Sequence, residues 1–294
     1  MAGQPRQHMT TVNGIDLCWF EWGERRSESV TTLLVHATGF HARCWDRTVA
    51  HLDGHVIAID MRGHGRSAKT PPYTWESFGT DTAAFIEALD LQRIVGAGHS
   101  MGGHSVTQAA GHAPGRFERL VLVDPVIMSP EAYAARGSDR WMGVGAPEDH
   151  PTARRRNRWA SVEEMVARFS GERSPFVGWQ PEVVRDYCSW GLLPAPDGDG
   201  FVLACPPVVE ASIYMGSSSL DLYALIDALA LPVTVLRAPP RDDTSTAMDF
   251  SKSPTWPGLA ARFRHGRDVY LPARTHFIPM EDPALTADYI AGRL

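Results

Sequence analysis

The chain has 294 residues, of which 44% are hydrophobic, so it is long enough to bury a large core. Its formal net charge is −6, from 28 Lys and Arg against 34 Asp and Glu, and this balance argues against a nucleic-acid or anionic-membrane partner. No apolar run approaches the ~18 residues that a membrane span requires.

The cysteines and the first ten residues bear on the cellular compartment. The four cysteines form no C-x-x-C pair, and no metal-ligand spacing or phosphate-binding loop points to a metal or a cofactor. Residues 1–10 are polar and lack the apolar segment of an export signal. We therefore expect a cytoplasmic protein with reduced, buried thiols. The cysteines are Cys18, Cys44, Cys188 and Cys205.

Short apolar runs recur along the chain, each followed by a glycine-rich turn and then a helical pattern. This rhythm is typical of βα units around a parallel sheet. Ahead of them, the apolar runs 9–12 and 15–22 are separated by Asn13-Gly14, so we expect an antiparallel hairpin at one sheet edge. The predicted parallel strands are residues 31–36, 55–60, 93–99, 119–124, 231–236 and 268–271.

The rhythm breaks between residues 126 and 229, where no convincing pair of buried strands is seen. Because an insertion after the C-terminal end of a strand lies where α/β sheets bind ligands, we predict a helical cap at 126–229 on a core formed by 1–125 and 230–294.

Within this segment, the basic run 154–156 is expected to form a solvated face or a salt-bridge cluster. Helical patterns occupy 161–169, 181–187 and 219–229. Four tryptophans line an apolar pocket or form the cap's own core: Trp141, Trp159, Trp179 and Trp190.

Ser100 lies in the run Gly98-His99-Ser100-Met101-Gly102, which fits the pattern G-x-S-x-G. A serine on a tight strand-to-helix turn needs small residues two positions away on each side, and here the pattern follows a predicted strand and precedes a helical segment rich in small residues. A serine hydroxyl is a weak nucleophile at neutral pH unless a base accepts its proton. We therefore predict that Ser100 is an activated nucleophile rather than a serine in an ordinary glycine turn.

An activated serine also needs oxyanion donors and a base. The backbone N–H of Met101, directly after the nucleophile, is one predicted donor, and we assign the other to Thr38, in the loop after the first parallel strand. Among twelve histidines, His276 follows the last predicted strand, where the chain order of nucleophile, acid and base requires the base. The histidines nearer the site in sequence are expected to shape the pocket or to form local hydrogen bonds: His36, His64 and His99.

Several aspartates compete to orient the base. Asp124 ends the fourth parallel strand and precedes Pro125, a position where an aspartate can equally be a turn-former. The loop after the next strand offers three alternatives but contains no G-x-x-D motif. We favour Asp124 as the acid and keep these alternatives open. They are Asp242, Asp243 and Asp249.

Five segments together resemble the α/β-hydrolase superfamily, and the resemblance covers roughly residues 10–125 and 230–294. The segments are HATGF at 36–40, DMRGHGRS at 60–67, GHSMGG at 98–103, LVLVDP at 120–125 and THFIPM at 275–280. The resemblance implies a mostly parallel central sheet flanked by helices, with an inserted helical cap. Two departures are the Ala37 that stands where the family has glycine, and the missing G-x-x-D. Zearalenone-type lactonases place the acid after the earlier strand, with a spacing similar to that of Ser100 and Asp124.

The resemblance implies a serine hydrolase that cleaves a carboxylic ester or lactone of a small, apolar molecule through an acyl-enzyme intermediate. Haloalkane dehalogenases and epoxide hydrolases of this fold have an aspartate where Ser100 stands, so both are rejected. A carbon–carbon bond hydrolase also uses serine and stays open. A non-catalytic small-molecule receptor on the same scaffold is the alternative from another class. The substrate and the oligomeric state do not follow from the sequence.

Overall fold

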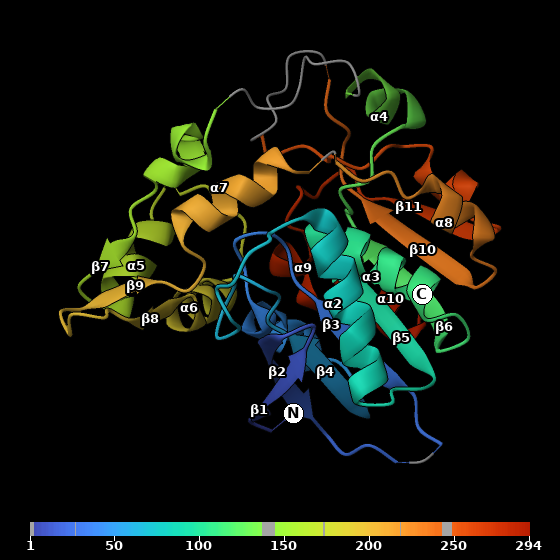
Figure 1. The fold of residues 1–294 in the computed structure, drawn as a ribbon, viewed down its shortest axis with the longest axis horizontal. Helices are drawn as coiled ribbons and strands as arrows, with labels where there is room; N and C mark the ends of the chain where they lie inside the picture. Colours follow the sequence, from blue (N-terminus) through green and yellow to red (C-terminus); the bar gives the residue numbers. More distant parts are fainter. Residues whose placement is uncertain (1–2, 27, 137–144, 173, 218, 243–248) are drawn as a thin grey trace.

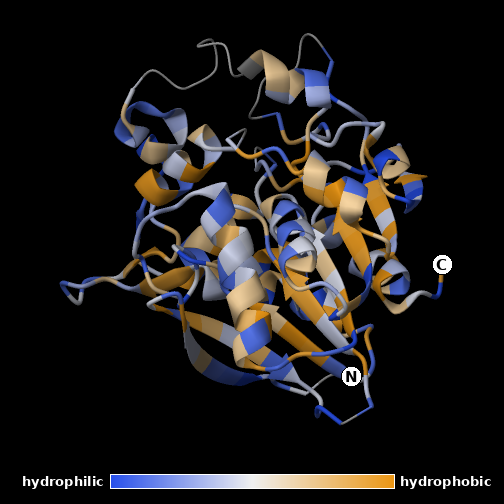
Figure 2. Ribbon diagram, turned by 45° about the vertical axis from the view of Figure 1, so that its right-hand side comes forward, coloured by the Kyte–Doolittle hydropathy of each residue, from blue (hydrophilic) through white to orange (hydrophobic). Residues whose placement is uncertain are grey.

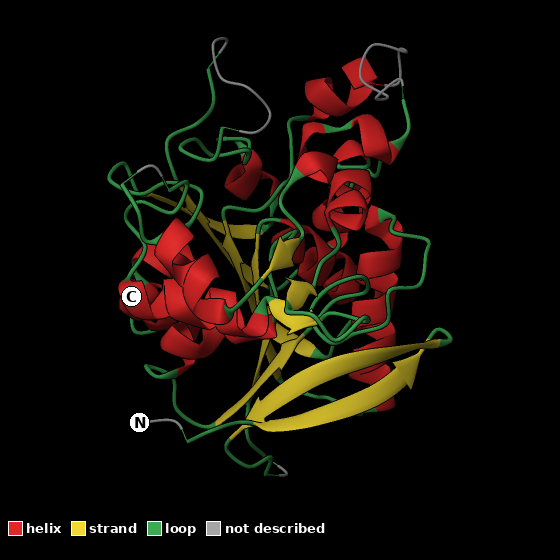
Figure 3. Ribbon diagram, turned by 90° about the vertical axis from the view of Figure 1, so that its left-hand side faces the viewer, coloured by secondary structure: helices red, strands yellow, loops and turns green. Residues whose placement is uncertain are grey.

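The computed structural model describes residues 3–26, 28–136, 145–172, 174–217, 219–242 and 249–294. An eight-stranded sheet forms its centre, and helices cover both faces of the sheet (Figures 1 and 3). The strand order is β1-β2-β4-β3-β5-β6-β10-β11. The strands are β1 (Arg6–Val12), β2 (Ile15–Trp22), β3 (Thr31–Val35), β4 (His55–Ile59), β5 (Ile94–His99), β6 (Phe117–Val123), β10 (Pro232–Arg237) and β11 (His265–Tyr270).

Six strands, β3 to β6 with β10 and β11, run parallel, whereas β1 and β2 form an antiparallel edge on β4. The predicted mostly parallel sheet with its N-terminal hairpin is therefore confirmed. Asn13 and Gly14 form the hairpin turn, and both have positive φ, 49° and 74°, as a two-residue turn of this kind requires.

Two apolar clusters pack on opposite faces of the sheet. Strand β3 illustrates the arrangement, because Leu33 and Val35 belong to one cluster and Leu34 belongs to the other. Successive side chains of a strand point to opposite faces, so a fully apolar strand fits between two helical layers. Figure 2 shows the hydrophobic residues concentrated along the strands and the hydrophilic ones on outer turns and helix faces.

The helical layers are formed by helices that lie between strands in the chain and by two helices that follow β11. Helices α2 (Trp75–Ala88) and α3 (Met101–His112) pack together on one face. On the other, α1 (Asp46–Val49) contacts α10 (Pro283–Ala291), which is preceded by α9 (Ile278–Glu281). Short 3₁₀ helices lie in connections: η1 (Ala42–Trp45), η2 (Pro147–Asp149), η3 (Pro151–Arg154) and η4 (Leu259–Arg262). Within the described ranges, no helix combines the length and hydropathy needed to cross a bilayer.

The segment between β6 and β10 is mostly helical but also contains strands that the sequence did not reveal. Its elements are α4 (Pro130–Arg136), β7 (Arg158–Trp159), α5 (Val162–Phe169), α6 (Pro181–Trp190), β8 (Leu192–Pro194), β9 (Phe201–Leu203), α7 (Pro207–Met215) and α8 (Tyr223–Ala228). The strands form a small antiparallel sheet, β7-β9-β8, and each is too short to produce a period-two pattern. Helix α8 packs against α3 beside the central sheet, apart from α5 to α7 (Figure 1).

Candidate active site

Ser100 occupies a strained turn between β5 and α3. Its backbone has φ 56° and ψ −117°, a conformation that non-glycine residues rarely adopt. A Cβ at position 98 would lie 2.2 Å from the carbonyl oxygen of Gly102, and one at position 102 would lie 2.1 Å from that of Val35. Both flanking positions must therefore be glycine, which is the physical content of the G-x-S-x-G pattern.

His276 lies between Ser100 and Asp124. Its Nε2 is 3.0 Å from the Ser100 Oγ, and its Nδ1 is 2.6 Å from Oδ2 of Asp124. The side chains come from three places: the end of β5, the end of β6 and the loop before α9. All three residues are buried, with exposed fractions of 6% for Ser100, 3% for His276 and 0% for Asp124. Nδ1–H can donate to the carboxylate while Nε2 accepts the serine proton.

The carboxylate of Asp124 is held from a second side. Its Oδ1 accepts hydrogen bonds from the backbone N–H of Ala238 at 3.0 Å and from the Ser253 hydroxyl at 2.6 Å. The residue itself has φ 46°, so the end of β6 turns sharply and directs the side chain toward His276. Neither the Ala238 amide nor Ser253 carries a sequence signal for this role, because the role depends on which loops meet across β6 and β10.

The alternative acids lie elsewhere. Asp242 is exposed, and Asp249 accepts hydrogen bonds from the backbone N–H and the hydroxyl of Ser251 through its Oδ1. The bonds from Ser251 lower the pKa of Asp249. Asp243 lies outside the described residues. The structure thus brings Asp124, and not Asp249, to His276.

The two residues predicted to supply the oxyanion donors, Thr38 and Met101, are in side-chain contact beside Ser100. The Thr38 hydroxyl donates to Sδ of Met101 at 3.3 Å, which joins the loop after β3 to the start of α3. Among the residues that the structure describes, neither the Thr38 nor the Met101 backbone N–H donates a hydrogen bond to a protein acceptor. Both amides are therefore available to a ligand, and the N-terminus of α3 adds a favourable dipole for negative charge.

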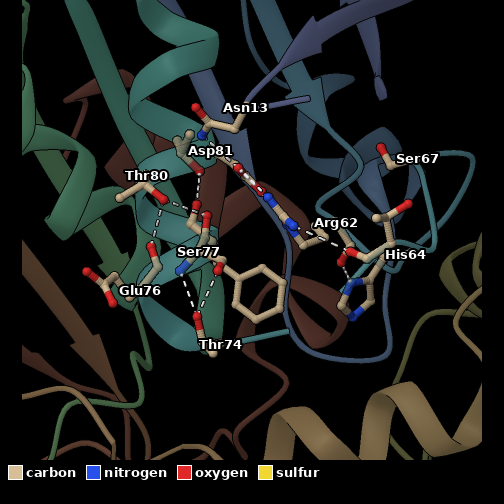
Figure 4. A network of polar contacts seen from close by, with 12 residues as sticks. Asn13, Arg62, His64, Ser67, Thr74, Glu76, Ser77, Thr80 and Asp81 are labelled. Carbon is tan, nitrogen blue, oxygen red and sulfur yellow. Dashed lines mark hydrogen bonds and ion pairs between the residues drawn. The ribbon is translucent and has the colours of Figure 1, made fainter. Parts of the chain in front are cut away.

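A network of polar side chains that includes Arg62, His64 and Asp81 (Figure 4) supports the loop that carries Thr38. Gly39 donates its N–H to Nε2 of His64 at 3.0 Å, and His64 Nδ1 donates to the Arg62 carbonyl at 2.9 Å. Burial lowers the pKa of His64 well below its usual value, which keeps its Nε2 an acceptor. Arg62 in turn forms a buried bidentate pair with Asp81 of α2, at 2.7 and 2.8 Å. The chain of contacts links α2 to the loop.

His99 supports the base rather than the nucleophile. Its Nε2 donates to the backbone carbonyl of His276 at 2.8 Å, and the two ring centroids are 5.0 Å apart. Burial, followed by the nearby His276, lowers the pKa of His99 well below its usual value. The ring is neutral, and it holds the backbone of His276 in place.

A cavity of about 220 Å³ opens onto Ser100 and His276. Phenylalanine and tyrosine make up most of its apolar wall, and no tryptophan of the described residues lines it. Trp159 and Trp179 are buried in an apolar cluster with Phe176 and Tyr187. The same cluster includes Phe40 and Phe277, so the two tryptophans pack where the inserted segment meets the loops of the sheet. Trp141 lies outside the described residues. The aromatic residues that line the cavity are Phe40, Phe169, Phe176, Tyr187, Tyr214, Phe250 and Phe277.

One ion pair also reaches this cavity. Arg155 pairs with Glu210 and donates to the hydroxyl of Tyr187 at 3.2 Å. Burial raises the pKa of Glu210, and the neighbouring guanidinium opposes that rise. In the described part of the chain, no cluster of three or more His, Cys, Asp or Glu side chains could hold a metal ion.

Comparisons with known proteins agree with this architecture. Residues 32–289 match the sequence profile of the alpha/beta hydrolase family. A non-heme chloroperoxidase of Streptomyces lividans is 36% identical over 123 residues, which cover 40% of this chain and 44% of that protein. Lipase LipV of Mycobacterium tuberculosis is 28% identical over 194 residues, covering 61% of this chain and 70% of the lipase. The match to the chloroperoxidase thus spans less than half of that relative.

Solved structures are similar over nearly the whole chain. An E-2-(acetamidomethylene)succinate hydrolase superposes with a TM-score of 0.74 at 19% identity, covering 98% of each chain. The enol-lactonase from Burkholderia xenovorans LB400 gives a TM-score of 0.65 at 20% identity, covering 97% of this chain and 98% of the lactonase. At such identities the likeness concerns the fold. From its sequence match and its architecture, the chain belongs to the alpha/beta hydrolase family.

Proposed function

We propose that this protein is a serine hydrolase that cleaves a carboxylic ester or lactone of a small, largely apolar molecule. The observation that carries the proposal is the hydrogen-bonded series of Ser100, His276 and Asp124 beside an aromatic cavity. A lipase and an enol-lactonase among the similar proteins support the same reaction class.

The reaction divides into acylation and deacylation. Ser100 Oγ attacks the carbonyl carbon while His276 Nε2 takes its proton, and Asp124 stabilises the imidazolium that forms. The backbone N–H groups of Thr38 and Met101 stabilise the tetrahedral oxyanion. His276 then returns the proton to the leaving oxygen, which departs as an alcohol. Water repeats the sequence on the acyl-enzyme and releases the acid, so each proton is carried by the chain or by water.

The inserted segment is proposed to act as a cap that selects the substrate. Phe169, Tyr187 and Tyr214, which line the cavity, come from its helices α5, α6 and α7. Phe40 and Phe277, from the loops of the sheet, complete the aromatic wall. An enclosed aromatic wall favours an apolar acyl or aryl group because its burial removes apolar surface from water.

The test uses a fluorophosphonate probe together with p-nitrophenyl esters and simple aromatic lactones. We expect the probe to label Ser100, located by peptide mass spectrometry, and Ser100→Ala to abolish both labelling and turnover. A folded wild-type protein that neither reacts nor turns over any ester or lactone would overturn the proposal. Binding of apolar ligands without turnover would instead support the receptor alternative, and cleavage of a β-diketone alone would support the carbon–carbon hydrolase.

A further inference from the structure

A second cavity, of about 570 Å³, adjoins the one that contains Ser100. Three residues line both cavities: Arg155, Phe169 and Pro175. The second cavity lies within the inserted segment, where the end of η3 meets α5, and Trp159 and Phe169 contribute apolar wall. The two cavities are therefore neighbours that share part of their lining.

The lining of the second cavity is strongly basic. Four of its described lining residues are arginines, and none is an aspartate or glutamate. Three of these arginines are the basic run at 154–156, and the fourth, Arg168, lies in the last turn of α5. This concentration contrasts with the formal net charge of −6 for the chain. The arginines are Arg154, Arg155, Arg156 and Arg168.

Two of these arginines already have carboxylate partners and two do not. Arg155 pairs with Glu210, and Arg156 pairs with Glu164 at 2.5 Å. Arg156 also lies over the ring of Trp159, 4.3 Å from its centroid. Among the described residues, Arg154 and Arg168 have no carboxylate oxygen within 4.0 Å, and both are exposed. In the described part of the chain, the cavity is therefore lined by two arginines without a carboxylate oxygen within 4.0 Å.

We propose that this second cavity binds an anionic end of the substrate, while the ester carbonyl lies at Ser100. The inference rests on the proposed hydrolase function and adds a substrate class to it: an elongated ester that carries a distal carboxylate or phosphate. Guanidinium groups match both anions because their N–H donors form paired hydrogen bonds to two oxygens. Arg154 and Arg168 contact the anion, and Arg155 and Arg156 add to the positive potential.

The experiment compares p-nitrophenyl esters of alkanoic acids that differ only at the far end of the acyl chain. For each of several chain lengths, one ester ends in a carboxylate, one in a phosphonate and one in the neutral methyl ester of that carboxylate. We expect an anionic ester of suitable length to have a kcat/KM about tenfold above that of its neutral counterpart at low salt, mainly through KM. The advantage should shrink at about 0.5 M salt because screening weakens exposed charge pairs. The phosphonate and carboxylate arms identify the preferred anion.

The variant for this test is the double substitution Arg154→Gln with Arg168→Gln. It should remove most of the anionic advantage and leave kcat/KM for the neutral esters within about twofold. The matched control is Arg185→Gln with Arg264→Gln. Both of these arginines are exposed, line neither cavity and have no carboxylate within 4.0 Å in the described part of the chain. The control variant changes the net charge equally and should keep the advantage.

Two outcomes would overturn the inference while the proposed function stands: neutral esters hydrolysed as well as every anionic ester, or an anionic advantage that the cavity variant retains. In either case Arg168 would serve only the C-terminal end of α5, where a cation is also favourable. Failure of Ser100 to react with fluorophosphonate and of all esters to turn over would instead count against the hydrolase function itself.

Discussion

The backbone N–H of Gly39 donates to Nε2 of His64 at 3.0 Å, so this amide already has a protein partner, and the bond anchors the loop that carries Thr38. Gly39 has φ 80°, and a Cβ there would lie 2.6 Å from Oε1 of Glu210. The loop therefore packs against His64 and against the buried carboxylate of Glu210. We infer that His64 is a positioning residue for the proposed oxyanion site.

Substitution of His64 tests this role. Leucine cannot accept the Gly39 hydrogen bond, so we expect His64→Leu to lower kcat about tenfold with little change in KM, since loss of an oxyanion donor itself costs ~10²–10³. Glutamine offers an acceptor oxygen, and His64→Gln should restore part of the loss. Steady-state kinetics on a neutral ester, with circular dichroism to verify folding, make the comparison. A folded leucine variant with unchanged kcat would contradict the role.

The aspartate that orients the base can be identified by single amide substitutions. Asp124→Asn should lower kcat by about 10⁴, because the amide favours the wrong tautomer of His276. Asp249→Asn is the matched control, and it should keep near-normal activity because Asp249 bonds to Ser251 rather than to His276. Near-normal turnover in Asp124→Asn would show that another group orients the base.

Buried histidines predict a loss of stability in mild acid. Burial lowers the pKa of His41 and of His104 to about 4, below the value of ~6.5 expected in the unfolded chain. Because the unfolded state then binds more protons, unfolding free energy falls as pH drops from about 6.5 toward about 4. Each histidine should contribute about 1 kcal/mol of this loss by pH ~5.5.

Urea unfolding at a series of pH values measures this effect. His104→Gln should flatten the pH dependence relative to the wild type. An identical pH slope in the His104 variant and the wild type would argue that His104 does not contribute.

The buried pair of Arg62 and Asp81 should matter more to stability than surface pairs. Both side chains are nearly inaccessible, with exposed fractions of 6% and 4%, and Asn13 also donates to Asp81 at 2.9 Å. Asp81→Ala leaves a buried guanidinium without its partner, so unfolding free energy should fall by about 3 kcal/mol or more. Asp288→Ala, which removes the exposed pair with Arg293, should cost under ~1 kcal/mol. Urea titrations compare the two variants, and equal losses would contradict the argument.

Local chain chemistry was sufficient to predict much of the molecule. The Asn13-Gly14 turn, the parallel strands and the strained turn at Ser100 depend on residues close together in sequence, where turn geometry and side-chain periodicity act directly. His276 could be assigned as the base because it follows the last strand, where the α/β-hydrolase order of nucleophile, acid and base places a histidine. These features therefore needed no knowledge of how distant loops meet.

Only the tertiary structure decided which aspartate contacts His276. Asp124 reaches the imidazole because the end of β6 lies between β5 and β10, and because the Ala238 amide and Ser253 converge on its second oxygen. Likewise, no local pattern distinguishes an arginine at a cavity wall from one on a solvated face. The run at 154–156 was expected to form a solvated face or a salt-bridge cluster, and Arg155 and Arg156 do form ion pairs. Its approach to the cavity at Ser100 arises because η3 packs against α7, whose Glu210 pairs with Arg155, and because the end of α5 lines the same second cavity.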